Sequence, residues 1–198
     1  MYPRTLSYIN SKVMIIGLVG LGGSGKGTIT AYVTKKYGAK TVKFSQPLRD
    51  IIHRMYKQET RDDMADLAEF LRRHYGNDIL VQTLMKDLEK MDIDIVVFDG
   101  IRYADEFNAL KKRKDFVLWS VDAEIKTRFD RIHIRGENAD DSTLTFDAFK
   151  QQHELPTEKP IPGIMKQADF ALDNNGTLDE LYSQVDSLVE KSRDAIKD

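Results

Sequence analysis

The sequence predicts an α/β protein built on a five-stranded parallel sheet with helices on both faces. Short apolar runs rich in β-forming residues alternate along the chain with longer segments of helical periodicity. A glycine-rich turn lies directly between the first apolar run and the first helical segment. The 198 residues are enough for one domain with a substantial core, and we treat residues 1–198 as that domain.

The five expected strands are short and mostly apolar, which is typical of strands buried on both faces of a parallel sheet. They cover Val13 to Val19, Thr41 to Phe44, Ile93 to Phe98, Phe116 to Val121 and Phe170 to Leu172. Because the segments between them have helical patterns, a parallel sheet covered by helices is expected.

The expected helices carry apolar residues at helical spacing between turn residues. They cover Gly25 to Tyr37, Pro47 to Tyr56, Arg61 to His74, Asp78 to Met91, Asp105 to Lys112, Ala123 to Arg135, Phe146 to Gln152 and Leu178 to Ile196. Leu80, Leu84 and Leu88 are four residues apart and therefore share one face. Thr177 precedes the final helix and is its predicted N-cap.

Two regions interrupt the alternation of strands and helices. Residues 46–92 contain three helical segments, more than a simple crossover needs, and we expect an inserted subdomain that holds a second ligand. Residues 136–163 are polar and rich in proline, a composition that suits a mobile lid or an ordinary surface loop equally well. Residues 1–12 are expected to be a short extension without a function of its own.

Composition excludes several classes of function. The formal net charge is -2, with 30 basic and 32 acidic side chains, so there is no general electrostatic case for binding nucleic acid. Cysteine is absent, which excludes disulfides and thiolate ligands. Apolar runs are too short to span a membrane, and residues 1–12 lack the apolar core of a secretory signal. We expect a cytoplasmic enzyme, a monomer or a homodimer, without a membrane partner.

The glycine-rich turn Gly20-Leu-Gly-Gly-Ser-Gly-Lys-Gly-Thr28 has the composition of a phosphate-binding loop. Its glycines allow positive φ angles and close approach of the backbone to oxygen atoms. Successive N–H groups and the start of the following helix then attract an anion, and Lys26 adds a charge over the β and γ phosphates. The expected nucleotide-binding residues are Gly22, Gly23, Ser24, Gly25, Lys26, Gly27 and Thr28.

The order Gly-Lys-Gly-Thr places Gly27 where the common pattern has the hydroxyl residue. This form resembles the nucleoside monophosphate kinases of the adenylate kinase type. The resemblance implies ATP as phosphate donor with Mg²⁺ held largely through water, so that Thr28 is a possible metal ligand rather than a required one.

Asp99 ends the run Ile95-Val-Val-Phe-Asp99 and therefore lies at the carboxyl edge of the sheet, where open α/β folds bind ligands. We expect it to hold Mg²⁺ or its waters. The stretch Asp99-Gly-Ile-Arg102 also resembles the Asp-Gly-x-Pro-Arg element of nucleoside monophosphate kinases, although it lacks the proline and is one residue shorter. That resemblance implies that Arg102 binds the phosphate of the acceptor.

Three arginines, at positions 128, 131 and 135, form a stripe on one helix that leads into the expected lid. In a phosphoryl-transfer enzyme such guanidinium groups stabilise charge on the group in transit. We expect catalytic roles for Arg131 and Arg135, with Arg131 also contacting ATP. A solvated helix face is the alternative, which we favour more for Arg128.

Further segments extend the resemblance over most of the chain. Phe44-Ser-Gln-Pro-Leu-Arg49 resembles Phe-x-x-Pro-Leu-Lys of the deoxynucleoside monophosphate kinases of tailed bacteriophages, and Arg102-Tyr-Ala-Asp-Glu106 resembles another of their segments. The resemblance implies acceptor-site roles for Ser45 and Arg49. Arg72 and Arg73 lie in the insertion, and Tyr103 beside a strand, where surface or packing roles are favoured.

Two other functions remain open. Dephospho-CoA kinases share the fold and a stretch similar to residues 168–174, but they act on a hydroxyl and carry aspartates after the second strand, where this chain has Phe44-Ser45-Gln46. An acceptor that already carries an ionised phosphate needs no strong base, so a nucleotide acceptor is favoured. A regulatory ATPase is the alternative of another class, although it would need neither the arginine stripe nor the insertion.

The sequence therefore predicts a P-loop kinase of the nucleoside monophosphate kinase type. By analogy with that group the sheet order is 2-3-1-4-5, in a three-layer arrangement with a helical acceptor-binding insertion and a short lid. The expected ligands are ATP, Mg²⁺ and a small nucleotide acceptor. Lys26, Asp99, Arg131 and Arg135 are the expected catalytic residues.

Overall fold

The computed structural model describes residues 13–58, 60–89, 91–135 and 144–196. The extension expected over residues 1–12 and the first part of the expected lid, residues 136–143, lie outside these described ranges. Among the described residues, none of the helices has both the length and the apolar character needed to cross a bilayer.

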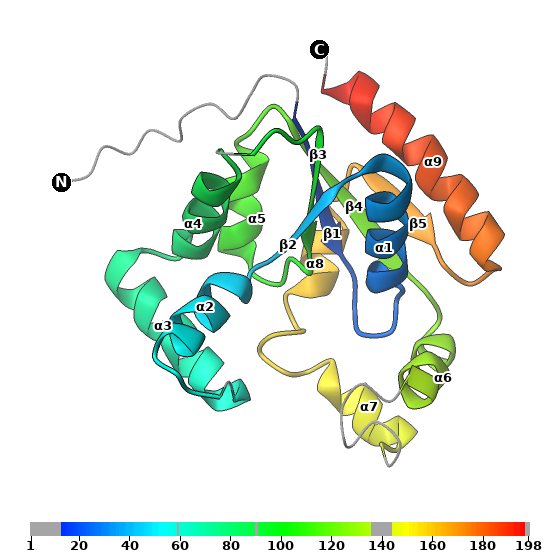
Figure 1. Ribbon diagram of the computed structural model, residues 1–198. Helices are drawn as coiled ribbons and strands as arrows, with labels where there is room; N and C mark the ends of the chain where they lie inside the picture. The colour runs from blue at the N-terminus through cyan, green and yellow to red at the C-terminus, as the bar shows by residue number, and fades with distance from the viewer. Residues whose placement is uncertain (1–12, 59, 90, 136–143, 197–198) are drawn as a thin grey trace.

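Five parallel strands form one sheet in the order β2-β3-β1-β4-β5, which confirms the predicted order. The strands are β1 (Met14–Val19), β2 (Lys40–Lys43), β3 (Ile95–Asp99), β4 (Phe116–Asp122) and β5 (Phe170–Asp173). Leu18 of β1 pairs in register with Asp99 of β3, and Val19 pairs with Ser120 of β4. The carboxyl ends of these strands therefore meet at one edge of the sheet (Figure 1).

The helices connect the strands and continue around the sheet. They are α1 (Lys26–Tyr37), α2 (Gln46–Arg54), α3 (Arg61–Tyr75), α4 (Ile79–Leu88), α5 (Ala104–Lys111), α6 (Ile125–Arg135), α7 (Phe146–Gln152), α8 (Ile161–Met165) and α9 (Leu178–Ala195). The three helical segments expected in the insertion are α2, α3 and α4. Thr177 caps α9 as predicted, because its side chain accepts a hydrogen bond from the Glu180 N–H.

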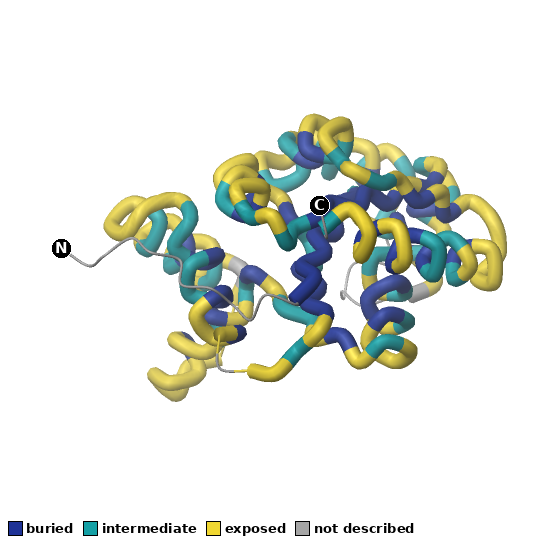
Figure 2. The backbone as a smooth tube through the Cα atoms, turned by 90° about the horizontal axis from the view of Figure 1, so that it is seen from above, coloured by how far each residue is buried: buried dark blue, intermediate teal, exposed yellow. Residues whose placement is uncertain are grey.

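Alternate residues of the strands feed two apolar cores, one on each face of the sheet. Ile15 of β1 packs with residues of α2, α4, α5 and α8, whereas Ile16 packs with residues of α1 and α9. This division follows from the period of two along a strand, which sends neighbouring side chains to opposite faces. Figure 2 shows the buried segments gathered in the middle of the molecule, with exposed stretches around them.

Helix α8 is an element that the sequence analysis missed. Residues 136–163 were expected to be lid or surface loop, yet Ile161 and Ile164 are almost completely buried beneath β1 and β4. The reason is the spacing of these two isoleucines, which puts both on one face of a single helical turn that packs into the core. The region available for a lid therefore ends before Ile161.

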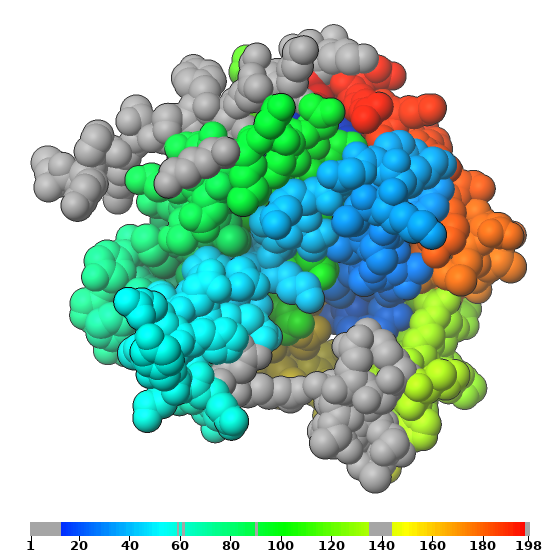
Figure 3. All heavy atoms as spheres, viewed as in Figure 1, coloured from blue at the N-terminus to red at the C-terminus, as the bar shows by residue number. Residues whose placement is uncertain are grey.

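The helices of the insertion and the helices that follow β4 flank the carboxyl edge of the sheet. In the space-filling view, α2 and α3 (cyan) lie on one side of this edge and α6 (yellow-green) on the other (Figure 3). Because ligands of open α/β sheets bind at this edge, these helices flank the place where ligands are expected.

Candidate nucleotide-binding and acceptor site

The glycine-rich turn connects the buried strand β1 to helix α1, as predicted. Gly23 and Gly25 have φ angles of 78° and 104°, in the left-handed region that favours glycine. A Cβ atom at Gly23 would lie 2.5 Å from the Arg128 carbonyl oxygen, so a larger residue has no room there. The loop is thus shaped by its glycines and by the chain packed against them.

Helix α1 begins without a side-chain cap, unlike several other helices of the protein. Gly25 occupies its N-cap position and no acidic residue lies in its first turn. The caps of α3, α7 and α9 are threonines whose hydroxyls accept a hydrogen bond from the first turn. The first N–H groups of α1 and the positive end of its dipole can therefore interact with an anion from outside the helix.

Two polar side chains inside the loop are suited to phosphate oxygens. The Lys26 ammonium group donates to the carbonyl oxygens of Gly20 and Leu21, at 2.5 and 3.2 Å. The Ser24 hydroxyl is fully buried and has no hydrogen-bond partner within the described chain. A buried polar atom normally has a hydrogen-bond partner, so the Ser24 hydroxyl, unpaired within the described chain, indicates that a ligand contacts the loop.

Two side chains from distant parts of the sequence brace the loop. The Arg128 guanidinium donates to the carbonyl oxygens of Ala123 (3.0 Å) and Gly22 (3.4 Å) and lies over the ring of Phe149. The Asn174 amide, just after β5, donates to the Ser24 carbonyl oxygen at 2.8 Å. Both side chains are at least nine-tenths buried, so they hold the loop in its shape.

The arginine stripe on α6 therefore divides into different roles. Arg128 is buried, so the solvated helix face that we favoured for it is wrong; its guanidinium is turned inward to the carbonyl oxygens of Ala123 and Gly22. Arg131 is half-buried, and its Nη1 atom has no hydrogen-bond partner in the described part of the chain. Arg135 ends α6, and its side chain lies outside the described residues. Arg131 is thus the member of the stripe that, within the described residues, has an unpaired guanidinium nitrogen.

The end of β3 runs directly beside the loop. The N–H groups of Gly100 and Ile101 donate to the Leu18 carbonyl oxygen, at 3.2 and 3.1 Å. This places Asp99, which is half-buried, next to the strand that leads into the loop. The described residues hold no cluster of three or more metal-binding side chains. Asp99 and Thr28 nevertheless carry oxygen ligands of the kind that Mg²⁺ accepts, since this ion takes one or two protein oxygens and completes its shell with waters and phosphates.

Arg102 follows at the same edge and is paired with an acid that the sequence analysis did not single out. Its Nη1 atom donates to the Glu158 carboxylate at 2.8 Å. The Arg102 side chain is about half exposed (51%), whereas that of Glu158 is mostly buried (14%). Glu158 lies 56 residues further along the chain, so no local pattern could have revealed the contact.

Ser45 and Arg49 occupy the first turn of α2, which follows β2. Ser45 is the N-cap residue, and its carbonyl oxygen accepts a hydrogen bond from the Arg49 N–H at 3.0 Å. Both residues are half-buried at the carboxyl edge of the sheet. The acceptor-binding role that the resemblance to phage kinases implies for them stays a prediction.

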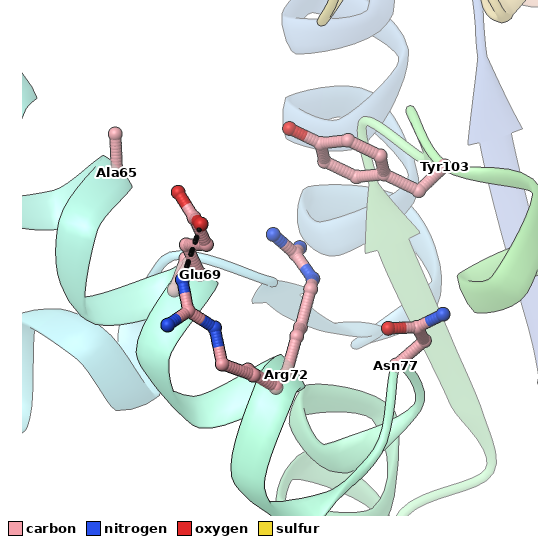
Figure 4. A pocket seen from close by; sticks show the side chains of 7 residues that line it. Ala65, Glu69, Arg72, Asn77 and Tyr103 are labelled. Atoms are coloured by element: carbon pink, nitrogen blue, oxygen red, sulfur yellow. Dashed lines mark hydrogen bonds and ion pairs between the residues drawn. The ribbon is translucent and has the colours of Figure 1, made fainter.

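A cavity of about 480 Å³ lies between α3 and the start of α5. It is lined by Ala65, Ala68, Glu69, Arg72, Arg73, Asn77 and Tyr103. The Arg72 guanidinium lies 4.3 Å from the centre of the Tyr103 ring, and Figure 4 shows both side chains pointing toward one another. Tyr103 therefore lines a cavity rather than packing in the core.

A buried carboxylate fixes the orientation of Arg72. Glu106 of α5 is 2% exposed, and its Oε1 atom accepts a hydrogen bond from Arg72 Nη2 at 2.9 Å. Burial raises the pKa of Glu106, while the charge of Arg72 acts in the opposite direction. Its second oxygen accepts from the backbone N–H groups of Arg102 and Tyr103, at 3.5 and 3.4 Å. Glu106 thus holds both the Arg72 side chain that lines the cavity and the turn that carries Arg102.

The AAA domain family matches residues 19–145, which is more than half of the chain. The chain belongs to this family. The matched part begins at the end of β1 and includes the phosphate-binding loop, the insertion and the arginine stripe.

Uncharacterised archaeal proteins are similar over almost the whole chain. A UPF0200 protein of Sulfurisphaera tokodaii is 29% identical over 181 residues, covering 91% of this chain and 98% of the relative. A UPF0200 protein of Methanocaldococcus jannaschii is 26% identical over 182 residues, covering 90% of each. These relatives extend the likeness beyond the matched domain to β5 and α9.

Solved kinases share the fold. A shikimate kinase from Bacteroides thetaiotaomicron has a TM-score of 0.53 at 18% identity, covering 90% of this chain and 97% of that chain. A gluconokinase from Sinorhizobium meliloti has the same TM-score at 15% identity, covering 92% and 95%. The predicted P-loop kinase-like fold is confirmed.

Proposed function

We propose that this protein is an ATP-dependent phosphotransferase of the cytoplasm that moves the γ-phosphate of ATP to a small nucleotide, most simply a ribo- or deoxyribonucleoside monophosphate. The observation that supports the proposal is the pairing of β1 with β3, which puts Asp99 beside the strand end that leads into the phosphate-binding loop, three residues before Arg102. A donor phosphate on the loop and an acceptor phosphate on Arg102 would then share one edge of the sheet.

The residues of the loop hold the donor in this proposal. The loop N–H groups and the start of α1 bind the β and γ phosphates, and the Lys26 ammonium group exchanges its carbonyl partners for phosphate oxygens. Mg²⁺ held by Asp99 with its waters, and possible contact to Thr28, would neutralise charge on the phosphates. Arg131 and Arg135 would stabilise the negative charge on the phosphoryl group during its transfer.

The acceptor lies between the turn after β3 and the insertion in this proposal. Arg102 and Arg49 bind its phosphate, and Ser45 contributes a hydroxyl at the start of α2. The cavity beside Tyr103 and Arg72 receives the rest of the molecule, because an aromatic ring and a fixed guanidinium suit a planar polar group.

A second candidate acceptor is a hydroxyl group, as in dephospho-CoA. The Glu158 carboxylate favours it, since it lies at Arg102 and a carboxylate there is suited to accept the proton of a hydroxyl. The residues directly after β2, Phe44-Ser45-Gln46, include no carboxylate, and Glu158 comes from another part of the chain.

An ADP-release assay against all eight common nucleoside monophosphates and dephospho-CoA tests the proposal. We expect acceleration by one monophosphate or a small group of them, abolished by Lys26→Ala and retained by the control Lys35→Ala on the exposed face of α1. Acceleration by dephospho-CoA alone would select the second candidate. ATP hydrolysis that ignores every acceptor would contradict both and indicate a regulatory ATPase.

A further inference from the structure

Glu158 is a mostly buried acid whose side chain meets the arginine assigned to the acceptor phosphate. It belongs to the turn between α7 and α8. The 2.8 Å bond to Arg102 joins this turn to the end of β3. The Glu158 carboxylate is therefore bonded to the guanidinium group that, in the proposed function, binds the acceptor phosphate.

The backbone holds Glu158 in a defined place. Its N–H donates to the Leu155 carbonyl oxygen at 2.9 Å, and its own carbonyl oxygen accepts from the Ile161 N–H at 3.0 Å. Pro156 and Pro160 flank the turn and restrict its backbone further. Ile161 is anchored in the core, so the carboxylate is presented from a fixed support.

Glu158 also acts electrostatically on two basic side chains, Arg128 and His153. Its charge acts to raise the pKa of Arg128 and of His153, although burial, the larger cause, lowers the pKa of both. Arg128 in turn contacts the Gly22 carbonyl oxygen of the loop. Glu158 is thus bonded to Arg102 directly, and its charge also reaches Arg128, which braces the loop.

We propose that Glu158 is a specificity-determining residue of the acceptor site: its carboxylate takes the place of the acceptor phosphate on Arg102, and an acceptor must displace it to bind. The inference rests on the proposed function. A guanidinium binds carboxylates and phosphates through the same planar set of donors. A phosphate carrying nearly two charges and three oxygens competes with one carboxylate, whereas a neutral hydroxyl compound does not.

The substitution Glu158→Gln removes the competing charge at nearly constant size. We expect the KM for the monophosphate selected by the ADP-release assay to fall roughly two- to tenfold. The change is modest because the Arg102–Glu158 ion pair is only partly buried and solvent weakens it. The KM for ATP stays unchanged. The matched control is Glu154→Gln, an exposed acid of the same segment that lies near Lys159 instead of Arg102. We expect Glu154→Gln to leave the KM for the monophosphate and the KM for ATP unchanged.

Two further measurements test whether the acceptor phosphate exchanges with the Glu158 carboxylate on Arg102. Combining Glu158→Gln with Arg102→Ala should abolish the gain, because the competing carboxylate matters only while Arg102 is present. Calorimetric titration with the eight monophosphates in the presence of ADP should show tighter binding to the Glu158→Gln protein. Titration with the corresponding nucleosides, which lack the phosphate, should show no difference between the two proteins.

The outcomes separate this inference from the proposed function. Monophosphate binding that tightens in Glu158→Gln without phosphorylation of any acceptor supports the exchange and contradicts phosphotransfer. Phosphorylation with an unchanged or raised acceptor KM in Glu158→Gln overturns the exchange alone. A fall in kcat at constant KM also overturns it and assigns the carboxylate to proton transfer from a hydroxyl. Absence of monophosphate binding to both proteins overturns both proposals.

Discussion

At the scale of single residues, the Arg128 guanidinium connects three parts of the chain that are distant in sequence. It donates to the Gly22 carbonyl oxygen in the loop, to the Ala123 carbonyl oxygen after β4, and to the Nε2 atom of His153 at 3.0 Å. Because an arginine can only donate, Nε2 must be unprotonated for this bond to exist. The contact therefore requires a neutral His153.

Acidification should weaken the protein through His153. Burial, followed by the charge of Arg128, holds the pKa of His153 below its ordinary value of 6.5, while Glu158 and Glu154 act in the opposite direction. Between that lowered pKa and 6.5 the unfolded chain binds more protons, so the free energy of unfolding falls as pH falls. One proton limits this slope to about 1.4 kcal/mol per pH unit.

Urea unfolding of the wild type and His153→Gln between pH 5 and 8 measures this effect. We expect a smaller loss of stability on acidification in the variant, because it lacks the titrating imidazole. His133→Gln is the control, since His133 is exposed at the end of α6 and its replacement should leave the pH dependence intact. Parallel pH profiles for wild type and His153→Gln would contradict the prediction.

At the scale of elements, a largely buried ion pair joins helix α3 of the insertion to helix α5, which follows β3. Arg72 of α3 and Glu106 of α5 are 20% and 2% exposed, whereas the neighbouring pair of Arg73 and Glu69 lies within α3 and is 71% exposed on both sides. The two pairs have the same length, 2.9 Å. Their contributions to stability differ because their environments differ. Removing one partner of the buried pair leaves a carboxylate buried without a counter-charge, whereas the exposed pair is screened by solvent.

Arg72→Ala should therefore destabilise the protein by roughly 2 to 3 kcal/mol, since it leaves Glu106 buried without its partner. Arg73→Ala is the matched neighbour and should cost about 0.5 kcal/mol or less. Denaturant unfolding of both variants compares them directly. Equal costs would show that the Glu106 carboxylate finds another partner or is protonated in the folded state.

Helices α1 and α9 are joined by a carboxylate with three donors. Asp186 accepts hydrogen bonds from Tyr32 and Tyr37 at 3.0 and 2.7 Å and from the Lys36 ammonium group at 2.6 Å. Tyr32 also stacks on Tyr182, with ring centres 4.0 Å apart. The cluster holds the helix that follows the phosphate-binding loop against the final helix.

Asp186→Ala should lower the melting temperature by roughly 2 to 5 °C, because two tyrosine hydroxyls and a lysine lose their shared acceptor. Glu190→Ala, an exposed acid of the same helix, is expected to change it by less than about 1 °C. Differential scanning calorimetry provides the measurement. A melting temperature equal to that of the wild type would show that water replaces the carboxylate at no cost.

At the scale of the whole molecule, the phosphate-binding loop depends on both ends of the sequence. Asn174, 150 residues beyond Ser24, donates to the Ser24 carbonyl oxygen, and its own N–H donates to the Asp122 carbonyl oxygen at 2.8 Å. A Cβ atom at Gly25 would collide with the Asn174 amide. The final strand therefore takes part in shaping a site that local sequence motifs assign to the first quarter of the chain.

Asn174→Ala should weaken nucleotide binding although Asn174 contacts only the back of the loop. Removing the amide leaves the buried Ser24 carbonyl oxygen unpaired, which costs about 1 to 3 kcal/mol and loosens the loop. We expect the Kd for ATP, measured by calorimetric titration, to rise by about tenfold or more. Asn175→Ala is the control, because Asn175 is exposed and bonds to the Glu124 N–H instead. An unchanged Kd in Asn174→Ala would contradict the role of the brace.

Much of the fold could be predicted from local patterns. Strands such as Ile95–Asp99 are continuous apolar runs, and Leu80, Leu84 and Leu88 are buried on one face of α4 as their spacing predicts. Helix α8 was missed because one turn has too few residues for a periodic signal, and its burial follows from packing under β1 and β4. Some helix ends matched the expected residue and the others shifted by one to three residues, as capping and fraying decide them.

The sequence by itself determined the glycine-rich loop, the alternation of strands and helices, and the positions of Asp99 and Arg102 after β3. These are local features, since backbone conformation and strand periodicity depend on neighbouring residues. The tertiary structure decided the partners: Glu158 on Arg102, Glu106 on Arg72, and Arg128 and Asn174 on the loop. Each contact joins residues at least 34 positions apart, because the parallel sheet brings the ends of separate strands to one edge.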